Sequence, residues 1–492
     1  MGEEVSSAVY SREQRQQYRE KVQLCLDVLG RMLASADMFS PGRLTTGMEI
    51  ELNLVDGDYQ PAMKNAAVLE RIADEAYQTE IGAFNIEFNV PPKPLPGRAI
   101  LDLEAMLRDS LNAAQVKANA AGANIVMVGI LPTLMQEHLT GDWMSPSTRY
   151  QALNDAMVDA RGEDIIIDIA GAERLRMAAK SIAPEAACTS LQLHVEVSPD
   201  MFAQYWNAAQ VLLGPQLAVG ANSPYFFGKQ LWAETRTEVF TQSTDVRPEE
   251  LRNQGVRPRV FFGDHWITSI WDLFEENVRY FPALLPELSE EDPEAVFEAG
   301  EPPQLTELRL HNGTVYRWNR PIYDVHGGTP HLRVENRVLP AGPTVVDTLA
   351  NAAFYYGALR SIAEDHRPAW TRMSFAAAHD NFLSCAKDGL DGTIYWPGTG
   401  PCPADELVLR KLLPMAEEGL RAWGMDAEAR DRYLGIVEER VTSGRNGASW
   451  QVQAVHRFEQ RGMDRRAALT AMLRAYSEGM HSNQPVHTWD IP

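Results

Sequence analysis

The chain has 492 residues, of which 45% are hydrophobic, and a formal net charge of −22 at pH 7. A chain of this length can bury a large core, and its excess of acidic residues disfavours nucleic acid and anionic membranes as partners. We expect a cytoplasmic protein with reduced thiols, because the sequence shows no apolar signal segment, no run long enough to span a membrane, and only 4 widely spaced cysteines.

The first predicted element is an amphipathic helix over residues 11–36. Residues 47–52, Gly-Met-Glu-Ile-Glu-Leu, then alternate as a strand does, so Glu49 and Glu51 point to the same face. Two carboxylates this close repel each other unless protons or cations lie between them. The pair has a purely structural reading, but it favours a cradle for Mg²⁺ or Mn²⁺, which prefer oxygen ligands.

A second acidic strand spans residues 80–90 and ends at two prolines. Its apolar residues share one face, Glu87 lies on the other, and Glu80 begins the segment. An edge strand with a solvated polar face has the same pattern. A long helix over residues 98–121 follows.

The third strand, residues 190–198, carries Gln192, His194 and Glu196 on its polar face. A single histidine on a strand is most often a hydrogen-bonded structural residue. The neighbouring carboxylate and carboxamide make this one a candidate metal ligand.

An acidic segment, residues 286–304, follows a predicted helix over residues 265–281. It contains 7 acidic residues and neither lysine nor arginine. This composition is typical of a solvated surface loop, and the alternative is a lid near a substrate entrance.

The fourth strand, residues 331–339, places His331, Arg333, Glu335 and Arg337 on one face. These side chains form either a surface salt-bridge ladder of little energetic value or a triphosphate site, where the acid binds a metal and the guanidinium groups bind phosphate oxygens. The sequence has no P-loop, no dinucleotide-binding glycine motif and no zinc-binding HExxH. If the protein uses ATP, metals and arginines must hold the phosphates.

Seven segments, in chain order, make the sequence similar to a known family. They are Gly47 to Leu52, the Glu87 strand with Pro91-Pro92, the His194 strand, Ala221-Asn222-Ser223-Pro224 with Gly228 and Arg236, Trp318 to Pro321, Glu335 to Arg337, and Asn381 to Gly392. On these segments the chain resembles the glutamate–cysteine ligase type 2 family of carboxylate–amine ligases, from about residue 44 to about residue 460. One departure is Lys387, where the family commonly has an arginine.

The resemblance implies an α+β fold with a curved antiparallel sheet, helices on its outer face and a glutamine synthetase-like catalytic domain. We expect an N-terminal helix within residues 1–40 that packs on the body, a catalytic domain over 41–403, and a helical C-terminal segment with a tail over 404–492. A long helix over 343–366 belongs to the catalytic domain. The last dozen residues are expected to be extended and poorly ordered, with docking of Trp489 onto the body as the alternative.

The implied reaction is ATP-dependent amide formation. ATP phosphorylates a carboxylate, usually the γ-carboxylate of glutamate, and the amine of cysteine, of another amino acid or of an amine metabolite displaces phosphate. The implied cofactors are ATP and Mg²⁺ or Mn²⁺, and the implied partners are small molecules. The sequence leaves open whether the chain forms a homo-oligomer.

The resemblance also assigns roles to residues. The metal ligands on the nucleotide side are Glu49, His194 and Glu335, and those on the acyl side are Glu51, Glu87 and Glu80. The catalytic residues are Arg337, which stabilises charge on the transferring phosphoryl group, and Arg320, which binds a phosphate or a carboxylate. Arg333 together with Arg337 binds the nucleotide. Arg236 and Asn222 bind the substrate.

Three other functions remain open on the same residues. A metal-dependent hydrolase or phosphatase would use the acid cluster without ATP. A non-catalytic binding protein would keep the fold alone, and a kinase would stop at the phosphorylated product.

Overall fold

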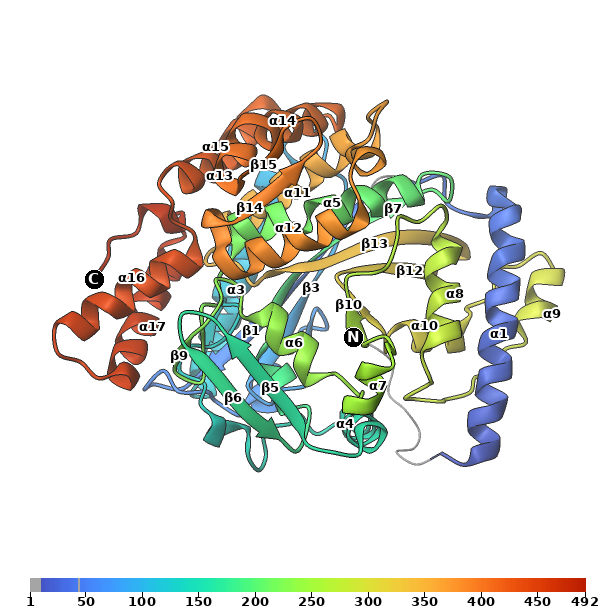
Figure 1. The fold of residues 1–492 in the computed structure, drawn as a ribbon, viewed down its shortest axis with the longest axis horizontal. Helices are drawn as coiled ribbons and strands as arrows, with labels where there is room; N and C mark the ends of the chain where they lie inside the picture. Colours follow the sequence, from blue (N-terminus) through green and yellow to red (C-terminus); the bar gives the residue numbers. More distant parts are fainter. Residues whose placement is uncertain (1–9, 43–44) are drawn as a thin grey trace.

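The computed structural model describes residues 10–42 and 45–492, so residues 1–9 of the expected N-terminal unit and residues 43–44 lie outside the described part (Figure 1). At its centre is a curved antiparallel sheet with the strand order β12, β13, β7, β1, β3 and β2, and with β4 beside the end of β1. These strands are β1 (Thr46–Val55), β2 (Tyr77–Thr79), β3 (Asn85–Lys93), β4 (Asn124–Val126), β7 (Ser190–Val197), β12 (Asn319–His326) and β13 (Thr329–Pro340). The predicted α+β class and its antiparallel sheet are confirmed.

The register of the sheet brings distant polar residues together. Glu51 of β1 is paired with Glu87 of β3. On the other side of β1, His194 of β7 is paired with Glu335 of β13, which is itself paired with Arg320 of β12. Because strand side chains alternate between faces, these pairs all leave the sheet on one side.

Two buried helices cover the opposite face of the sheet. They are α5 (Phe202–Gly220) and α11 (Val345–Ala363), and both are apolar around most of their circumference. The Tyr356 hydroxyl on α11 donates to the Gly47 carbonyl oxygen of β1 at 3.1 Å. Met48 of β1 is 4% exposed and lies on this apolar side of the sheet. The alternation of β1 therefore separates a packed face from a polar one.

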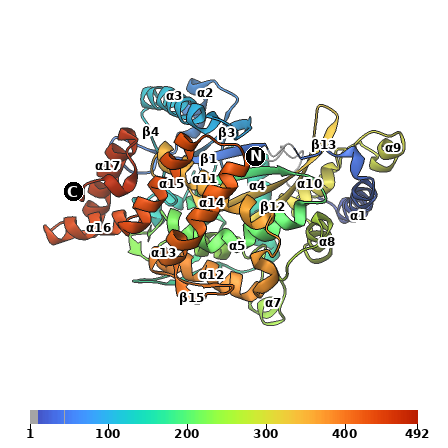
Figure 2. The same ribbon diagram turned by 90° about the horizontal axis from the view of Figure 1, so that it is seen from above.

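The first helix, α1 (Arg12–Ala34), lies at one end of the molecule beside α8 (Ile270–Tyr280), α9 (Pro293–Glu298) and α10 (Thr306–Asn312) (Figure 2). The helix predicted over 265–281 begins later, at Ile270, because Ser269 caps it.

The acidic segment 286–304 is not a bare loop. Asp292 caps α9 within it, and Arg31 of α1 forms an ion pair with Glu294 at 2.8 Å. The Arg31 guanidinium also lies over the Phe297 ring, 4.7 Å from its centroid. The segment is thereby attached to α1.

The C-terminal helices lie at the other end and over α11. They are α13 (Ala404–Leu407), α14 (Leu413–Ala422), α15 (Ala427–Thr442), α16 (Gly447–Gln460) and α17 (Arg465–Ser482). α14 crosses α11 where Gly357 and Gly419 face each other, so the two backbones approach without an intervening side chain.

The tail packs on the body through Trp489, the docking that the sequence left open. Trp489 is 7% exposed and packs edge-on against the rings of Trp450 and Tyr476. Arg445, in the turn before α16, donates to the carbonyl oxygens of His487 and Trp489 and so fixes the tail backbone beside the start of that helix.

The remaining elements complete the edges of the fold. They are α2 (Asn65–Ile72), α3 (Ala99–Ala120), α4 (Thr148–Arg161), α6 (Arg236–Ser243), α7 (Glu249–Asn253) and α12 (Phe375–Asp388), with short strand pairs β5 (Ile165–Ala170) with β6 (Arg174–Ala179), β8 (Tyr225–Phe226) with β9 (Lys229–Gln230), β10 (Val260–Phe261) with β11 (Tyr316–Arg317), and β14 (Thr393–Trp396) with β15 (Gly400–Pro403). Within residues 10–42 and 45–492, no helix has both the length and the apolar composition needed to cross a membrane.

Candidate active site

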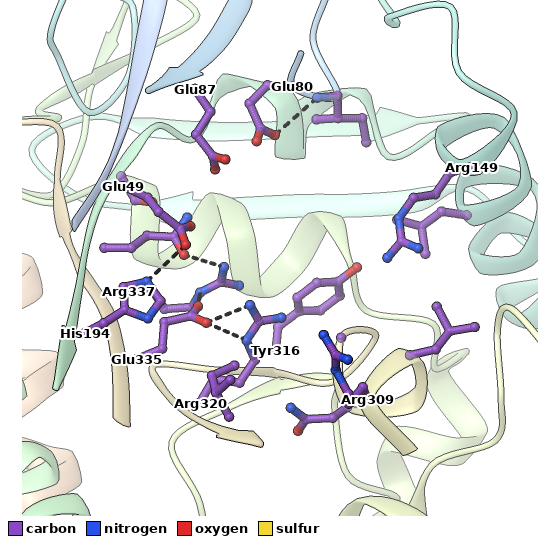
Figure 3. A pocket seen from close by; sticks show the side chains of 18 of the residues that line it. Glu49, Glu80, Glu87, Arg149, His194, Arg309, Tyr316, Arg320, Glu335 and Arg337 are labelled. Carbon is purple, nitrogen blue, oxygen red and sulfur yellow. Dashed lines mark hydrogen bonds and ion pairs between the residues drawn. The ribbon is translucent and has the colours of Figure 1, made fainter. Parts of the chain in front are cut away.

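The polar face of the sheet borders a cavity of about 630 Å³. Most of the site residues expected from the sequence line it, and Figure 3 shows several of them converging from different strands. The lining includes Glu49, Glu51, Glu80, Glu87, His194, Arg236, Arg320, Arg333, Glu335 and Arg337. Side chains from widely separated parts of the sequence therefore meet in one cavity.

Glu51, Glu80 and Glu87 form an acidic triad on the β1 and β3 side of the cavity. One carboxylate oxygen of each lies within 4.8 Å of the others. Glu51 is held by two donors from β7, the Ser190 N–H at 2.6 Å and the Gln192 Nε2 at 3.0 Å. The triad is therefore placed by the sheet, and its spacing suits oxygen ligands around one cation.

The acidic triad is electrostatically strained. Burial, reinforced by the charge of Glu87, raises the pKa of Glu51 to about 7. Burial and the charges of Glu87 and Glu51 raise the pKa of Glu80 well above its usual range, and burial with Glu49 raises the pKa of Glu87. Protons or a divalent cation relieve this repulsion, so these residues fit a bound Mg²⁺ or Mn²⁺.

A second group of charges lies beside the triad, on β1, β7 and β13. His194 Nε2 is 3.0 Å from Glu49 Oε1. Burial opposes ionisation of Glu49, but the attraction of His194 lowers its pKa below the usual range. Glu49 is thus a carboxylate in this cavity, next to an imidazole that is a suitable metal ligand.

Glu335 is the acid that the arginines surround. Arg320 Nε and Nη2 contact its Oε2 at 2.9 and 2.6 Å, and Arg337 Nε is 3.0 Å from its Oε1 (Figure 3). Burial opposes ionisation, but Arg320 and Arg337 keep the pKa of Glu335 below its usual range. Both oxygens already contact guanidinium groups, so a metal at Glu335 would share it with them.

Gln192 connects the two groups. Its Nε2 donates to Glu51 at 3.0 Å, and its Oε1 accepts from Arg337 Nη2 at 3.0 Å. The amide therefore fixes the distance between an acid of the triad and the arginine next to Glu335.

The three remaining residues expected at the site are Arg333, Arg236 and Asn222, and each of them already has hydrogen-bond partners within the protein. Arg333 lines the cavity and donates to His331 Nε2 at 2.8 Å. Arg236 also lines it, but its guanidinium already pairs with Glu234 at 2.9 Å and donates to the Val338 carbonyl oxygen.

Asn222 does not reach the cavity. It is fully buried, and its Nδ2 donates to the Ala341 carbonyl oxygen and to the Tyr476 hydroxyl, both at 2.8 Å. In place of the expected contact with substrate, the structure gives Asn222 a structural role between the sheet and α17.

Several residues that line the cavity lie outside the alternating segments of the sequence, and they were not predicted as site residues. They are Arg149 and Tyr150 on α4, Glu185 in the 3-10 helix η3 (Ala183–Ala187), Cys188, Arg309 on α10 and Tyr316 on β11. Glu287, Leu288 and Ser289 of the acidic segment also line the cavity, so that segment borders the site.

Comparison with known proteins gives one family and a shared fold. The family model described as glutamate–cysteine ligase family 2 matches residues 45–470. The structure is similar to a glutamate–cysteine ligase from Francisella tularensis solved in complex with AMP, at 11% sequence identity and a TM-score of 0.55, over 92% of this chain and 91% of that one.

A bifunctional glutathione synthetase from Pasteurella multocida is also similar. The sequence identity is 12% and the TM-score 0.51, over 92% of this chain but only 54% of that chain. At these identities the likeness establishes the fold alone. No curated protein sequence matches the chain.

Proposed function

Since the chain belongs to glutamate–cysteine ligase family 2, we propose that it is an ATP-dependent ligase that joins a carboxylate to an amine. The acyl substrate is glutamate, which reacts through its γ-carboxylate. The acceptor is the amine of cysteine, of another amino acid or of an amine metabolite. The γ-phosphoryl group of ATP moves to the carboxylate, and the amine then displaces phosphate to form the amide.

The observation that carries this proposal is the convergence of acids and arginines in one cavity. The acidic triad lies on one side of Gln192, and Arg337 with Arg320 lies on the other around Glu335. Acids that hold cations beside guanidinium groups form a site suited to phosphoryl transfer, in which positioning and charge neutralisation do most of the catalytic work.

We assign the residues as follows. Mg²⁺ or Mn²⁺ held by the acidic triad and by Glu49, His194 and Glu335 would neutralise charge on the phosphate groups. Arg337 and Arg320 bind oxygens of the transferring phosphoryl group, and a planar guanidinium fits this task. Arg333 binds nucleotide phosphates and Arg236 a substrate carboxylate.

The test is release of ADP from ATP, measured across a panel of amino acids and amines with glutamate present. We expect release to depend on glutamate, on one acceptor and on added Mg²⁺ or Mn²⁺. Release of phosphate from phosphate esters in the absence of ATP would instead identify a hydrolase. A protein that binds glutamate and ATP without any turnover would be a binding protein.

A further inference from the structure

Glu185 is a carboxylate of the cavity that none of the roles above uses. It belongs to η3 and lines the cavity together with Glu51 and Arg337. Its Oε2 is shielded from solvent and finds no hydrogen-bond donor among the described residues. A buried carboxylate oxygen without a donor is costly, so this atom is a binding position for a cation or a donor from outside the chain.

The backbone around Glu185 is fixed. The Ile182 N–H donates to Asn154 Oδ1 of α4 at 3.1 Å, and the Cys188 N–H donates to the Glu185 carbonyl oxygen at 2.9 Å. Pro184 begins the turn between them. Because both ends of η3 are anchored, the backbone of Glu185 is held at the wall of the cavity.

The other acids of the cavity outside the metal-binding set have partners. Glu287 accepts a hydrogen bond from the Tyr10 hydroxyl at 3.0 Å. Asp324 pairs with Arg309 at 3.0 Å and with Arg333 at 3.4 Å. Glu185 therefore stands apart as the acid with a buried oxygen that no donor satisfies.

Glu185 shares its cavity with Glu51, an acid assigned to the acyl side, and with Arg337, the arginine assigned to the phosphoryl group. Burial, reinforced by the charge of Glu51, raises the pKa of Glu185 to about 8, and Arg337 opposes that shift. Glu185 thus lies within electrostatic reach of the triad acid nearest the acyl substrate and of the arginine assigned to the phosphoryl group. An ammonium group bound at this position would therefore share the cavity with the activated carboxylate.

Building on the proposed ligase function, we propose that Glu185 is the catalytic carboxylate that binds the acceptor as its ammonium form and takes a proton from it. Once deprotonated, the amine nitrogen bonds to the carbonyl carbon, and the bond from that carbon to the phosphate oxygen breaks with its electron pair on the departing phosphate. The second proton of the nitrogen leaves with the phosphate. Glu185 returns its proton to solvent when the product leaves.

The experiment compares two nucleophiles on the same acyl phosphate. Hydroxylamine is largely uncharged at neutral pH and needs no base, so hydroxamate formation from ATP, glutamate and hydroxylamine reports activation alone. Amide formation with the natural acceptor, identified from the ADP panel, reports both steps. For Glu185→Gln we expect hydroxamate formation to stay within about 3-fold of wild type while amide formation falls by about 100-fold or more.

Glu238→Gln is the matched control. Glu238 is an acid on the neighbouring helix α6 whose pKa is likewise raised by burial, but it does not line the cavity and accepts from Gln242 Nε2 at 2.7 Å. Both rates should stay near wild type in this variant.

Other outcomes overturn the proposal. A Glu185→Gln variant that keeps both rates, or that loses both equally with an unchanged melting temperature, shows that Glu185 does not serve the acceptor. If that variant does not fold, Glu185→Asp carries the test: its shorter carboxylate should lower the ratio of amide to hydroxamate, and an unchanged ratio refutes the role. Failure of the ligase function itself is distinguishable, because wild type would then form neither product.

Discussion

Glu51 and Glu87 are direct partners across β1 and β3, so their carboxylates leave the sheet side by side into a buried cavity. Like charges directly opposite each other destabilise a sheet. Glu80 adds a third charge within 4.8 Å. Without a cation, the folded protein must therefore either bind protons at these carboxylates or be destabilised by their repulsion.

Stability in metal-free buffer should fall as pH rises from about 4.5 to about 7. The pKa of Glu51 rises from 4.5 to about 7 on folding, so between these values the folded state keeps a proton that the unfolded state has lost. Stability then decreases by up to about 1.4 kcal/mol per pH unit for each such group. Urea denaturation across this range with EDTA measures the slope. Saturating Mg²⁺ should flatten it, and an equal slope in both buffers contradicts a cation at the triad.

Glu87→Gln should weaken Mn²⁺ binding by about 10-fold or more, because it removes one charged ligand. The same change should raise the melting temperature of the metal-free protein, because it removes repulsion from Glu51. Titration calorimetry with Mn²⁺ and thermal melts in EDTA give the two results. Glu196→Gln is the control: Glu196 is also on a sheet strand, but Ser40 donates to it at 2.5 Å and it does not line the cavity. Equal Mn²⁺ affinity of Glu87→Gln and wild type would remove Glu87 from the metal site.

Arg337→Lys should lower kcat by about 100-fold or more with little change in melting temperature. Lysine keeps the charge next to Glu335 but cannot also reach Gln192, so the fixed donor for the phosphoryl group is lost. Steady-state ADP release measures the effect. Arg432→Lys, which changes an arginine paired with Glu104 outside the cavity, should leave kcat unchanged. A near-wild-type rate for Arg337→Lys would make that arginine structural.

Lys21→Met should destabilise the protein by about 1–3 kcal/mol, because it removes a cation from a buried acid. Lys21 Nζ lies 3.0 Å from Glu307, whose side chain is 1% exposed. In the control Arg31→Met the lost partner, Glu294, is 48% exposed, so the cost should stay below about 1 kcal/mol. Urea denaturation compares the two variants, and equal losses would show that burial of the partner does not matter.

The alternation of the strands made the core of the site predictable. A period of two places Glu49 and Glu51 on one face of their strand and puts Glu87 and His194 on the polar faces of theirs, and the family resemblance then joined the three strands in one site. The predicted curved sheet and its helices followed from the same pattern together with the family resemblance.

The other residues of the site lie on elements whose sequence does not alternate between apolar and polar residues. Glu185 belongs to a 3-10 turn, and Arg149 and Arg309 belong to helices, where nothing in the local sequence shows that a side chain faces a cavity. Asn222 is the opposite case, a residue whose motif indicated a contact with substrate but which lies outside the cavity. Its hydrogen-bond partners Ala341 and Tyr476 are more than 100 positions away in the sequence. Contacts of that range depend on tertiary packing alone.

The attachment of α1 has a consequence for the wall of the cavity. α1 precedes the family match that begins at residue 45, yet its Lys21 donates to the Ser289 carbonyl oxygen at 2.6 Å, and Ser289 borders the cavity. This wall of the cavity is thus braced by a helix outside the residues that the family model matches, whereas the acids and arginines of the site lie within them. A substitution at Lys21 would accordingly act on the Ser289 wall of the cavity and leave the strand acids and arginines in place.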